Sequence, residues 1–157
     1  MKPKSKKTFT YASSILIALA VGGISAWVNM GNMSTPALAR PPLSPPPWVF
    51  PVVWSILYSL MGISAASVYE SCCSGKSDAL FIYAVQLAVN FLWTVFYFSF
   101  QAVSISFFWL IFLLLLVILM TIRFERCSPG SGKLQIPYIL WLAFAAYLNL
   151  IIWILNK

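Results

Sequence analysis

The chain has 157 residues, of which 61% are hydrophobic and only 8% are charged, and its mean hydropathy is +0.89. Soluble domains carry about 25% charged residues, so this composition excludes an ordinary soluble protein. The net charge of +7 is not accompanied by a basic patch interleaved with exposed aromatics, so we expect no nucleic-acid partner. The sequence predicts a single integral membrane domain over residues 1–157.

Five segments are long and apolar enough to cross a bilayer as helices, which requires about 20 mostly apolar residues. They are residues 11–30, 48–68, 79–100, 104–122 and 134–155. The fourth is continuously apolar, whereas a barrel strand would alternate. The predicted fold class is therefore an all-α membrane protein, a bundle of five transmembrane helices with a proline-rich loop between the first two. The fourth helix has no polar residue over 107–120, and we expect it to be the most lipid-exposed.

The first segment has an alternative interpretation, because a basic start, an apolar core and small residues near Ala39 are typical of a cleaved signal peptide. However, the apolar core ends near Val28, far upstream of Ala39, and is long enough to span the membrane. A retained first helix is the favoured interpretation.

Residues 40–51 contain a run of prolines that leads directly into the second segment. Proline fixes φ and lacks an amide donor, so this run predicts an extended segment that ends where Pro47 or Pro51 enters the first turn of a helix. Pro137 opens the last segment in the same way. If both helices begin at the same outer membrane edge, Trp54 and Trp141 lie at similar depths.

Lysine and arginine set the expected orientation, because they concentrate on the cytoplasmic side of membrane proteins. Only Arg40 and Lys157 fall on one side of the five-helix arrangement. The other eight fall on the opposite side: Lys2, Lys4, Lys6, Lys7, Lys76, Arg123, Arg126 and Lys133. We therefore expect a cytoplasmic N-terminus, with the C-terminus and the proline-rich loop outside, in a bacterial inner or plasma membrane.

The three cysteines, Cys72, Cys73 and Cys127, fall on the predicted cytoplasmic side. Thiols stay reduced there, and no spacing typical of a metal site is present. We expect free thiols in turns and no metal centre.

Polar and aromatic residues follow helical spacing in three of the segments. Residues 86, 90, 93 and 97 in the third segment form one stripe. Amides at membrane depth are costly unless they face a partner or a cavity, so this stripe should point inward. Matching faces carry Trp54, Tyr58 and Met61 in the second segment and Tyr138, Trp141, Ala145 and Asn149 in the fifth.

Three uncharged inward faces of this kind indicate a pocket for a large flat apolar ligand with a few polar handles. The same aromatics would also form an interfacial belt, and the amides would also serve as links between helices. The first segment has small residues at Ser14, Ala18, Gly22 and Ala26, which favour close packing within the monomer over a dimer interface.

Several functions are excluded by the charged residues and by the lack of histidine. The only acidic residues, Glu70, Asp78 and Glu125, lie at predicted turns. An ion-coupled pump would carry an intramembrane charge, and acid–base catalysis would require histidine or paired carboxylates. We therefore expect no dedicated catalytic residues and no required cofactor.

Three separated blocks of the sequence resemble the tryptophan-rich sensory protein and translocator protein family, TspO/MBR, also called the peripheral benzodiazepine receptor family. The blocks are Pro41…Pro45-Pro46…Trp48-Val49-Phe50-Pro51…Trp54…Leu57-Tyr58…Gly62, then Gln86…Asn90…Trp93, and finally Pro137-Tyr138…Trp141…Phe144-Ala145…Leu148-Asn149. They stand in the family's order and extend over most of the chain.

The resemblance implies a five-helix bundle, commonly a homodimer, with a pocket beneath the loop between the first two helices. It implies porphyrins such as protoporphyrin IX and haem as ligands, and a role as a receptor or sensor that also transports them. Some bacterial members are linked to light-dependent porphyrin breakdown through two tryptophans that match Trp54 and Trp141. An enzyme of that kind, a small-molecule exporter and a plain scaffold remain alternatives.

The expected ligand site combines the family blocks with the inward stripes. This chain has Leu43 where the family usually has a loop tryptophan, so Trp48 is expected to take that aromatic role, and Arg40 to meet a propionate at the pocket mouth. The expected ligand-binding residues are Arg40, Trp48, Phe50, Trp54, Tyr58, Gln86, Asn90, Trp93, Tyr97, Tyr138, Trp141, Phe144, Ala145 and Asn149.

Overall fold

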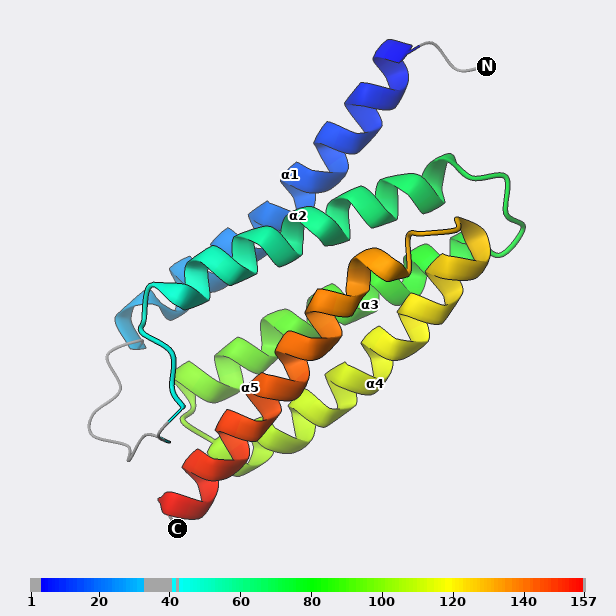
Figure 1. Cartoon of the computed structure of the whole chain (residues 1–157). Coiled ribbons are helices and arrows are strands. Elements are labelled where there is room, and N and C mark those ends of the chain that lie inside the picture. Colours follow the sequence, from blue (N-terminus) through cyan, green and yellow to red (C-terminus); the bar gives the residue numbers. More distant parts are fainter. Residues whose placement is uncertain (1–3, 33–40, 42, 157) are drawn as a thin grey trace.

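The computed structural model describes residues 4–32, 41 and 43–156. Five long helices lie alongside one another in a bundle (Figure 1). They are α1 (Lys4–Asn29), α2 (Val49–Glu70), α3 (Lys76–Thr94), α4 (Val103–Cys127) and α5 (Ile136–Leu155). Three short elements accompany them: the 3₁₀ turns η1 (Met30–Asn32) and η3 (Lys133–Gln135), and the π-helical turn η2 (Val95–Ser99), which continues α3.

The predicted five-helix fold class is confirmed, because five helices are long and apolar enough to cross a membrane and the described residues contain no strand. Residues 33–40 and 42 of the connection between α1 and α2, including Arg40, lie outside the described residues. The helix starts follow proline chemistry as predicted: Pro51 lies in the first turn of α2 and Pro137 in that of α5. α1 and α4 extend beyond their predicted bounds. The prediction used the length of the apolar stretch, which sets the part of a helix that crosses the membrane but not where the helix begins or ends.

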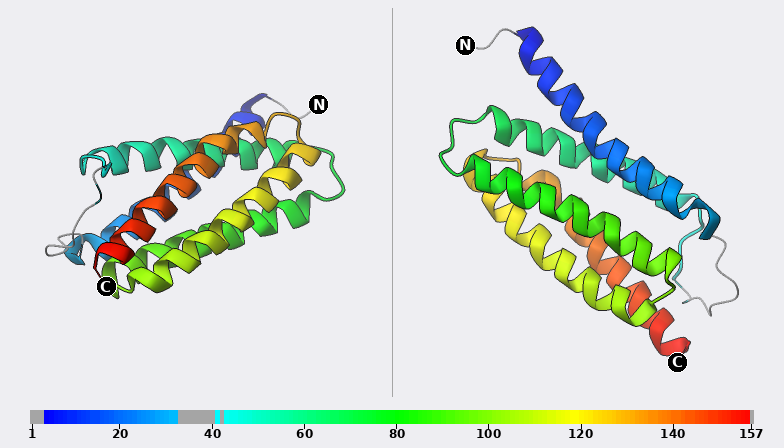
Figure 2. Two further views of the ribbon diagram at one scale, coloured as in Figure 1. Left: turned by 60° about the horizontal axis from the view of Figure 1, so that its bottom comes forward. Right: turned by 180° about the vertical axis from the view of Figure 1, so that it is seen from behind.

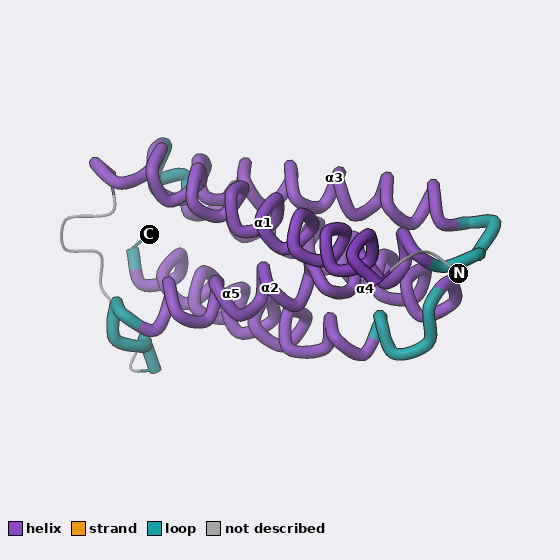
Figure 3. Tube along the Cα trace, turned by 90° about the horizontal axis from the view of Figure 1, so that it is seen from above, coloured by secondary structure: helices purple, strands orange, loops and turns teal. Residues whose placement is uncertain are grey.

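Consecutive helices run in opposite directions, as the views from different sides show together (Figures 1, 2 and 3). The start of α1, the connection 71–75 and the connection 128–132 lie at one end of the bundle (Figure 1). α2 and α5 are therefore antiparallel, and the expectation that both begin at the same edge is wrong. Three helices that each cross the bundle, α2, α3 and α4, separate the start of α2 from the start of α5, so the two starts lie at opposite ends.

α1 packs mainly on α2, α3 on α4, and α4 on α5. The contact between α1 and α2 is backbone to backbone: a Cβ added to Gly62 would lie 2.5 Å from Ile15 Cα. Ala18 is fully buried and Gly22 faces the Tyr58 ring, which confirms packing within the monomer, although Ala26 is exposed.

The expectation that α4 is the most lipid-exposed helix is wrong. Only 11% of the most apolar stretch of α1 is buried, compared with 28% in α4. α4 lies between two neighbours, α3 and α5, and buries Leu110, Leu113 and Val117 against them. α1 lies at one side of the bundle, and its first turns project beyond the other helices (Figure 2). An apolar sequence therefore does not reveal how many neighbours a membrane helix has.

The expectation of three free thiols is also corrected. Cys73 and Cys127 form a disulfide with their Cα atoms 5.1 Å apart, and only Cys72 is free. The two residues are separated by 54 positions in the sequence and meet because α4 ends beside the connection between α2 and α3. Spacing along the chain gave no indication of this contact.

Candidate ligand-binding site

A buried polar and aromatic cluster occupies the centre of the bundle where α2, α3 and α5 face each other. Gln86 and Asn90 are 0% exposed, and Trp93 is buried one turn further on. The Tyr138 hydroxyl donates to Gln86 Oε1 at 3.1 Å, and Asn90 Nδ2 donates to the Tyr58 hydroxyl at 3.3 Å. The predicted inward stripe on α3 is confirmed, because helical periodicity places these side chains on one face.

Trp54 lies at the aromatic centre of this cluster. Its ring centroid is 5.5 Å from that of Tyr58, 6.4 Å from that of Trp93 and 6.0 Å from that of Tyr138. Tyr97, in η2, extends the cluster by stacking on Trp93 at 5.7 Å. The rings come from three helices, so the cluster exists only in the assembled bundle.

Several polar atoms of the cluster and its surroundings are buried without a hydrogen-bond partner. They include Asn90 Oδ1, Trp93 Nε1, the Tyr83 hydroxyl and both amide atoms of Asn149. A buried polar atom without a partner costs about 1–3 kcal/mol. Such atoms beside aromatic rings are suitable contacts for a ligand with its own donors and acceptors.

A second part of the site is an apolar groove of about 370 Å³ between α2 and α5. It forms because backbone contact between these two helices is sparse in the described part of the chain. Trp141 lies in the groove, and Phe50 approaches it edge-on with ring centroids 5.7 Å apart. The lining residues are Val53, Ile56, Leu57, Pro137, Leu140, Trp141 and Phe144.

Trp54 and Trp141 occupy similar levels of the bundle, although their helices begin at opposite ends. Trp141 lines the groove together with Val53 and Leu57, which flank Trp54 along α2. The two indoles have different neighbours: Trp54 contacts the internal cluster, and Trp141 contacts Phe50 and Phe144. α2 therefore stands between two aromatic groups rather than one paired sandwich.

The remaining expected site residues fall in three situations. Ala145 is half-buried and follows the groove residue Phe144 on α5, and Asn149 is buried one turn further along the same helix. Trp48 precedes α2 and is 66% exposed, so in this structure it does not replace a loop tryptophan within the cluster. Arg40 lies outside the described residues.

Sequence reasoning missed a buried polar network between α1 and the end of α3. The Ser25 and Thr94 hydroxyls lie 2.7 Å apart, Asn29 Nδ2 donates to Thr94 Oγ1 at 3.1 Å, and the Ser99 hydroxyl donates to Asn29 Oδ1 at 3.0 Å. The spacing of Ser25 and Asn29, four residues apart on one helix face, was the available indication. This network holds α1 against η2, beside the aromatic cluster.

Comparison with known proteins agrees with this architecture. A family model described as the TspO/MBR family matches residues 14–154. The chain belongs to the TspO/MBR family. It is accordingly an integral membrane protein that crosses the bilayer several times.

Relatives of this TspO/MBR member include bacterial and animal proteins. It is 31% identical to the tryptophan-rich protein TspO of Chlorobaculum tepidum, with 97% of this chain and 99% of the relative aligned. It is 33% identical to protein CrtK of Rhodobacter capsulatus, over 95% and 94% of the two chains. The human translocator protein is 33% identical over 74% of this chain and 70% of its own.

Proposed function

We propose that this TspO/MBR protein is a membrane receptor or sensor for porphyrins such as protoporphyrin IX or haem, and that it acts without a required cofactor. The names of its relatives, sensory protein and translocator protein, support a receptor role. We infer the class of ligand from one observation: aromatic rings lie beside buried polar atoms that have no hydrogen-bond partner, Asn90 Oδ1 and Trp93 Nε1. A flat conjugated ring with nitrogen and carboxylate groups complements both features.

In this proposal the ligand enters from the groove side and parts α2 from α5. Sparse backbone contact between these helices makes their separation the least costly route into the bundle. Trp141, Phe144 and Phe50 then line the entry, and Trp54 and Trp93 cover one face of the macrocycle in the internal cluster. Asn90 and Gln86 hydrogen-bond its polar atoms, and Arg40 pairs with a propionate at the mouth.

The topology belongs to the same proposal. The end of the bundle that carries Lys76, Arg123, Arg126 and Lys133 faces the cytoplasm of a bacterial inner or plasma membrane, because basic residues concentrate on that side. The loop before α2 and the C-terminus then lie outside. We further propose a homodimer, with the exposed face of α1 available to a second copy.

A light-dependent porphyrin-degrading enzyme is the alternative, and one observation favours it. Trp54 lies within 6.4 Å, centroid to centroid, of three other readily oxidised rings, Tyr58, Trp93 and Tyr138. An excited porphyrin beside Trp54 or Trp141 would have an electron donor in contact. The receptor and enzyme hypotheses share the pocket and differ only in whether the ligand survives illumination.

One titration tests the proposal and separates it from the alternative. Purified protein in detergent micelles is titrated with protoporphyrin IX in the dark, and both tryptophan quenching and porphyrin absorbance are recorded before and after illumination. A receptor shows saturable quenching and stable absorbance. An enzyme shows quenching and a light-driven loss of absorbance beyond that of free porphyrin. The lack of saturable quenching would contradict both hypotheses. Trp27→Phe is the matched control, because Trp27 is 72% exposed on α1.

A further inference from the structure

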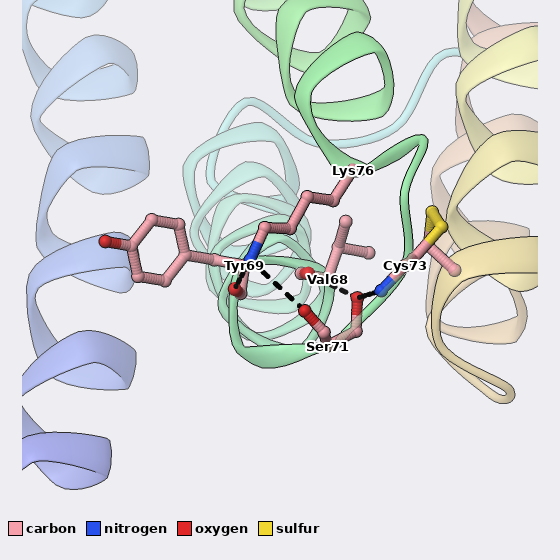
Figure 4. Close-up of a disulfide and its surroundings, with 6 residues drawn as sticks. Val68, Tyr69, Ser71, Cys73 and Lys76 are labelled. Atoms are coloured by element: carbon pink, nitrogen blue, oxygen red, sulfur yellow. Dashed lines mark hydrogen bonds between the residues drawn. A yellow bond between two sulfur atoms is a disulfide. The ribbon is translucent and has the colours of Figure 1, made fainter. Parts of the chain in front are cut away.

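The three cysteines gather at one end of the bundle, away from the aromatic cluster. Cys73, in the connection between α2 and α3, is bonded to Cys127, the last residue of α4, with the Cα atoms 5.1 Å apart (Figure 4). That separation lies within the usual range for a disulfide. Both residues are only half-buried, and Cys72 beside them is exposed. Small thiols and disulfides in solution therefore have access to this site.

The backbone around Cys73 is held by hydrogen bonds that do not depend on its sulfur. Lys76 N donates to the Cys73 carbonyl at 3.3 Å. The Lys76 ammonium donates to the Tyr69 carbonyl at 3.3 Å and to the Ser71 carbonyl at 3.2 Å (Figure 4). None of these three hydrogen bonds involves the Cys73 sulfur, so opening the disulfide removes none of them.

The end of α4 is fixed in the same manner. Glu125 accepts hydrogen bonds from the Gly130 and Gly132 amides, each at 3.0 Å, which closes the connection to α5. The Ser64 hydroxyl of α2 donates to the Ser131 carbonyl at 2.6 Å and fastens this connection to α2. These bonds, too, involve no cysteine sulfur, so opening the disulfide removes none of the contacts that hold the end of α4.

This end also carries Lys76, Arg123, Arg126 and Lys133, and the orientation proposed above places it in the cytoplasm. Cytoplasmic disulfides are rare, and those that occur are usually transient or redox-sensing. We propose that Cys73 and Cys127 form a reversible dithiol–disulfide couple, a modification site that reacts with low-molecular-weight disulfides such as glutathione disulfide. The inference rests on the proposed orientation and is independent of the ligand.

The exchange balances as two thiol–disulfide steps. One cysteine thiolate attacks glutathione disulfide, which forms a mixed disulfide and releases one glutathione. The second cysteine then attacks the protein sulfur of the mixed disulfide, which forms the Cys73–Cys127 bond and releases the second glutathione. The protein loses two hydrogens and one glutathione disulfide becomes two glutathione molecules. Excess glutathione drives the same steps in reverse.

The test uses the folded protein in detergent micelles, without denaturant. Samples are incubated with excess glutathione or excess glutathione disulfide, quenched in acid, unfolded, alkylated and measured by intact mass and peptide mapping. We expect alkylation of all three cysteines after glutathione, and a Cys73–Cys127 cross-link after glutathione disulfide. Cys72→Ser should show the same reversible cross-link, whereas Cys127→Ser should retain a glutathione adduct on Cys73.

Wild-type protein alone suffices to overturn the proposal. If glutathione reduces the Cys73–Cys127 bond only after the protein is unfolded, the bond is a permanent structural disulfide. If both cysteines remain fully alkylated after treatment with glutathione disulfide, they do not form a redox couple. Acid-quenched cells give an independent measurement: the pair should be reduced in unstressed cells and cross-linked after treatment with the thiol oxidant diamide. Complete cross-linking without diamide, or a bond from Cys127 to Cys72, would contradict the assignment.

Discussion

Asn90 Nδ2 donates a hydrogen bond to the Tyr58 hydroxyl at 3.3 Å and so links α3 to α2 at the centre of the bundle, while Asn90 Oδ1 is buried without a partner. The amide therefore has one atom engaged in the fold and one available to a ligand. We expect Asn90→Leu to lower stability by about 1 kcal/mol, since intramembrane hydrogen bonds average about 0.6 kcal/mol and reach about 1.7 kcal/mol, and also to weaken protoporphyrin binding. Thermal unfolding in micelles and dark titration measure the two effects.

Tyr58→Phe is the matched variant for this link, since it removes only the hydroxyl. In a double-mutant cycle the two changes should be less than additive, because both remove the same bond. Fully additive losses would show that the bond contributes nothing. An unchanged affinity in Asn90→Leu would show that Oδ1 does not meet the ligand.

The two tryptophans on either side of α2 give a second prediction. An aromatic ring stacked on a flat ligand contributes about 0.5–1.5 kcal/mol beyond burial, so Trp54→Phe or Trp141→Phe should cost modest protoporphyrin affinity. The double alanine variant should cost much more. If the protein degrades porphyrin, phenylalanine at either position should stop the light-driven absorbance loss even where binding persists. Unchanged binding by the double alanine variant would place the pocket elsewhere.

The close approach of α1 and α2 gives a third prediction, on stability. In Gly62→Ala the new methyl would lie 2.5 Å from Ile15 Cα and 2.8 Å from Ile15 N. Backbone atoms cannot rotate away, so α1 must shift, at a cost of about 1–3 kcal/mol. Gly23→Ala is the control, because nothing lies within 4 Å of its Cβ, and it should leave the melting temperature unchanged or slightly higher. Equal melting temperatures for the two variants would contradict this packing.

A fourth prediction addresses orientation. Cys72 is exposed, whereas Cys73 and Cys127 are half-buried, so Cys72 is the native cysteine most accessible to a label. A membrane-impermeant maleimide should leave it unlabelled in intact cells and label it after permeabilisation. A cysteine introduced at Ser34 in a Cys72→Ser background should react in intact cells. Labelling of Cys72 from outside would reverse the proposed topology.

Much of the candidate site could be predicted from the sequence because it depends on local periodicity. Gln86, Asn90 and Trp93 share one helix face at any bundle geometry, and amides are excluded from lipid. Their burial followed from those two facts. The exposure of Trp48 and the separation of Trp141 from Trp54 did not follow, because each depends on where one helix end lies relative to another helix.

The five spans, their proline starts and the inward stripe on α3 could be predicted from the amino-acid sequence, since apolar length, proline chemistry and helical periodicity are properties of short segments. The groove between α2 and α5, the greater exposure of α1 than α4, and the contact between Cys73 and Cys127 depend on how the helices pack. These features arise from the offsets and neighbours of antiparallel helices. Helices of similar apolar character pack in lipid with little difference in hydrophobic energy, so small residues such as Gly62 and a few buried polar bonds select the arrangement.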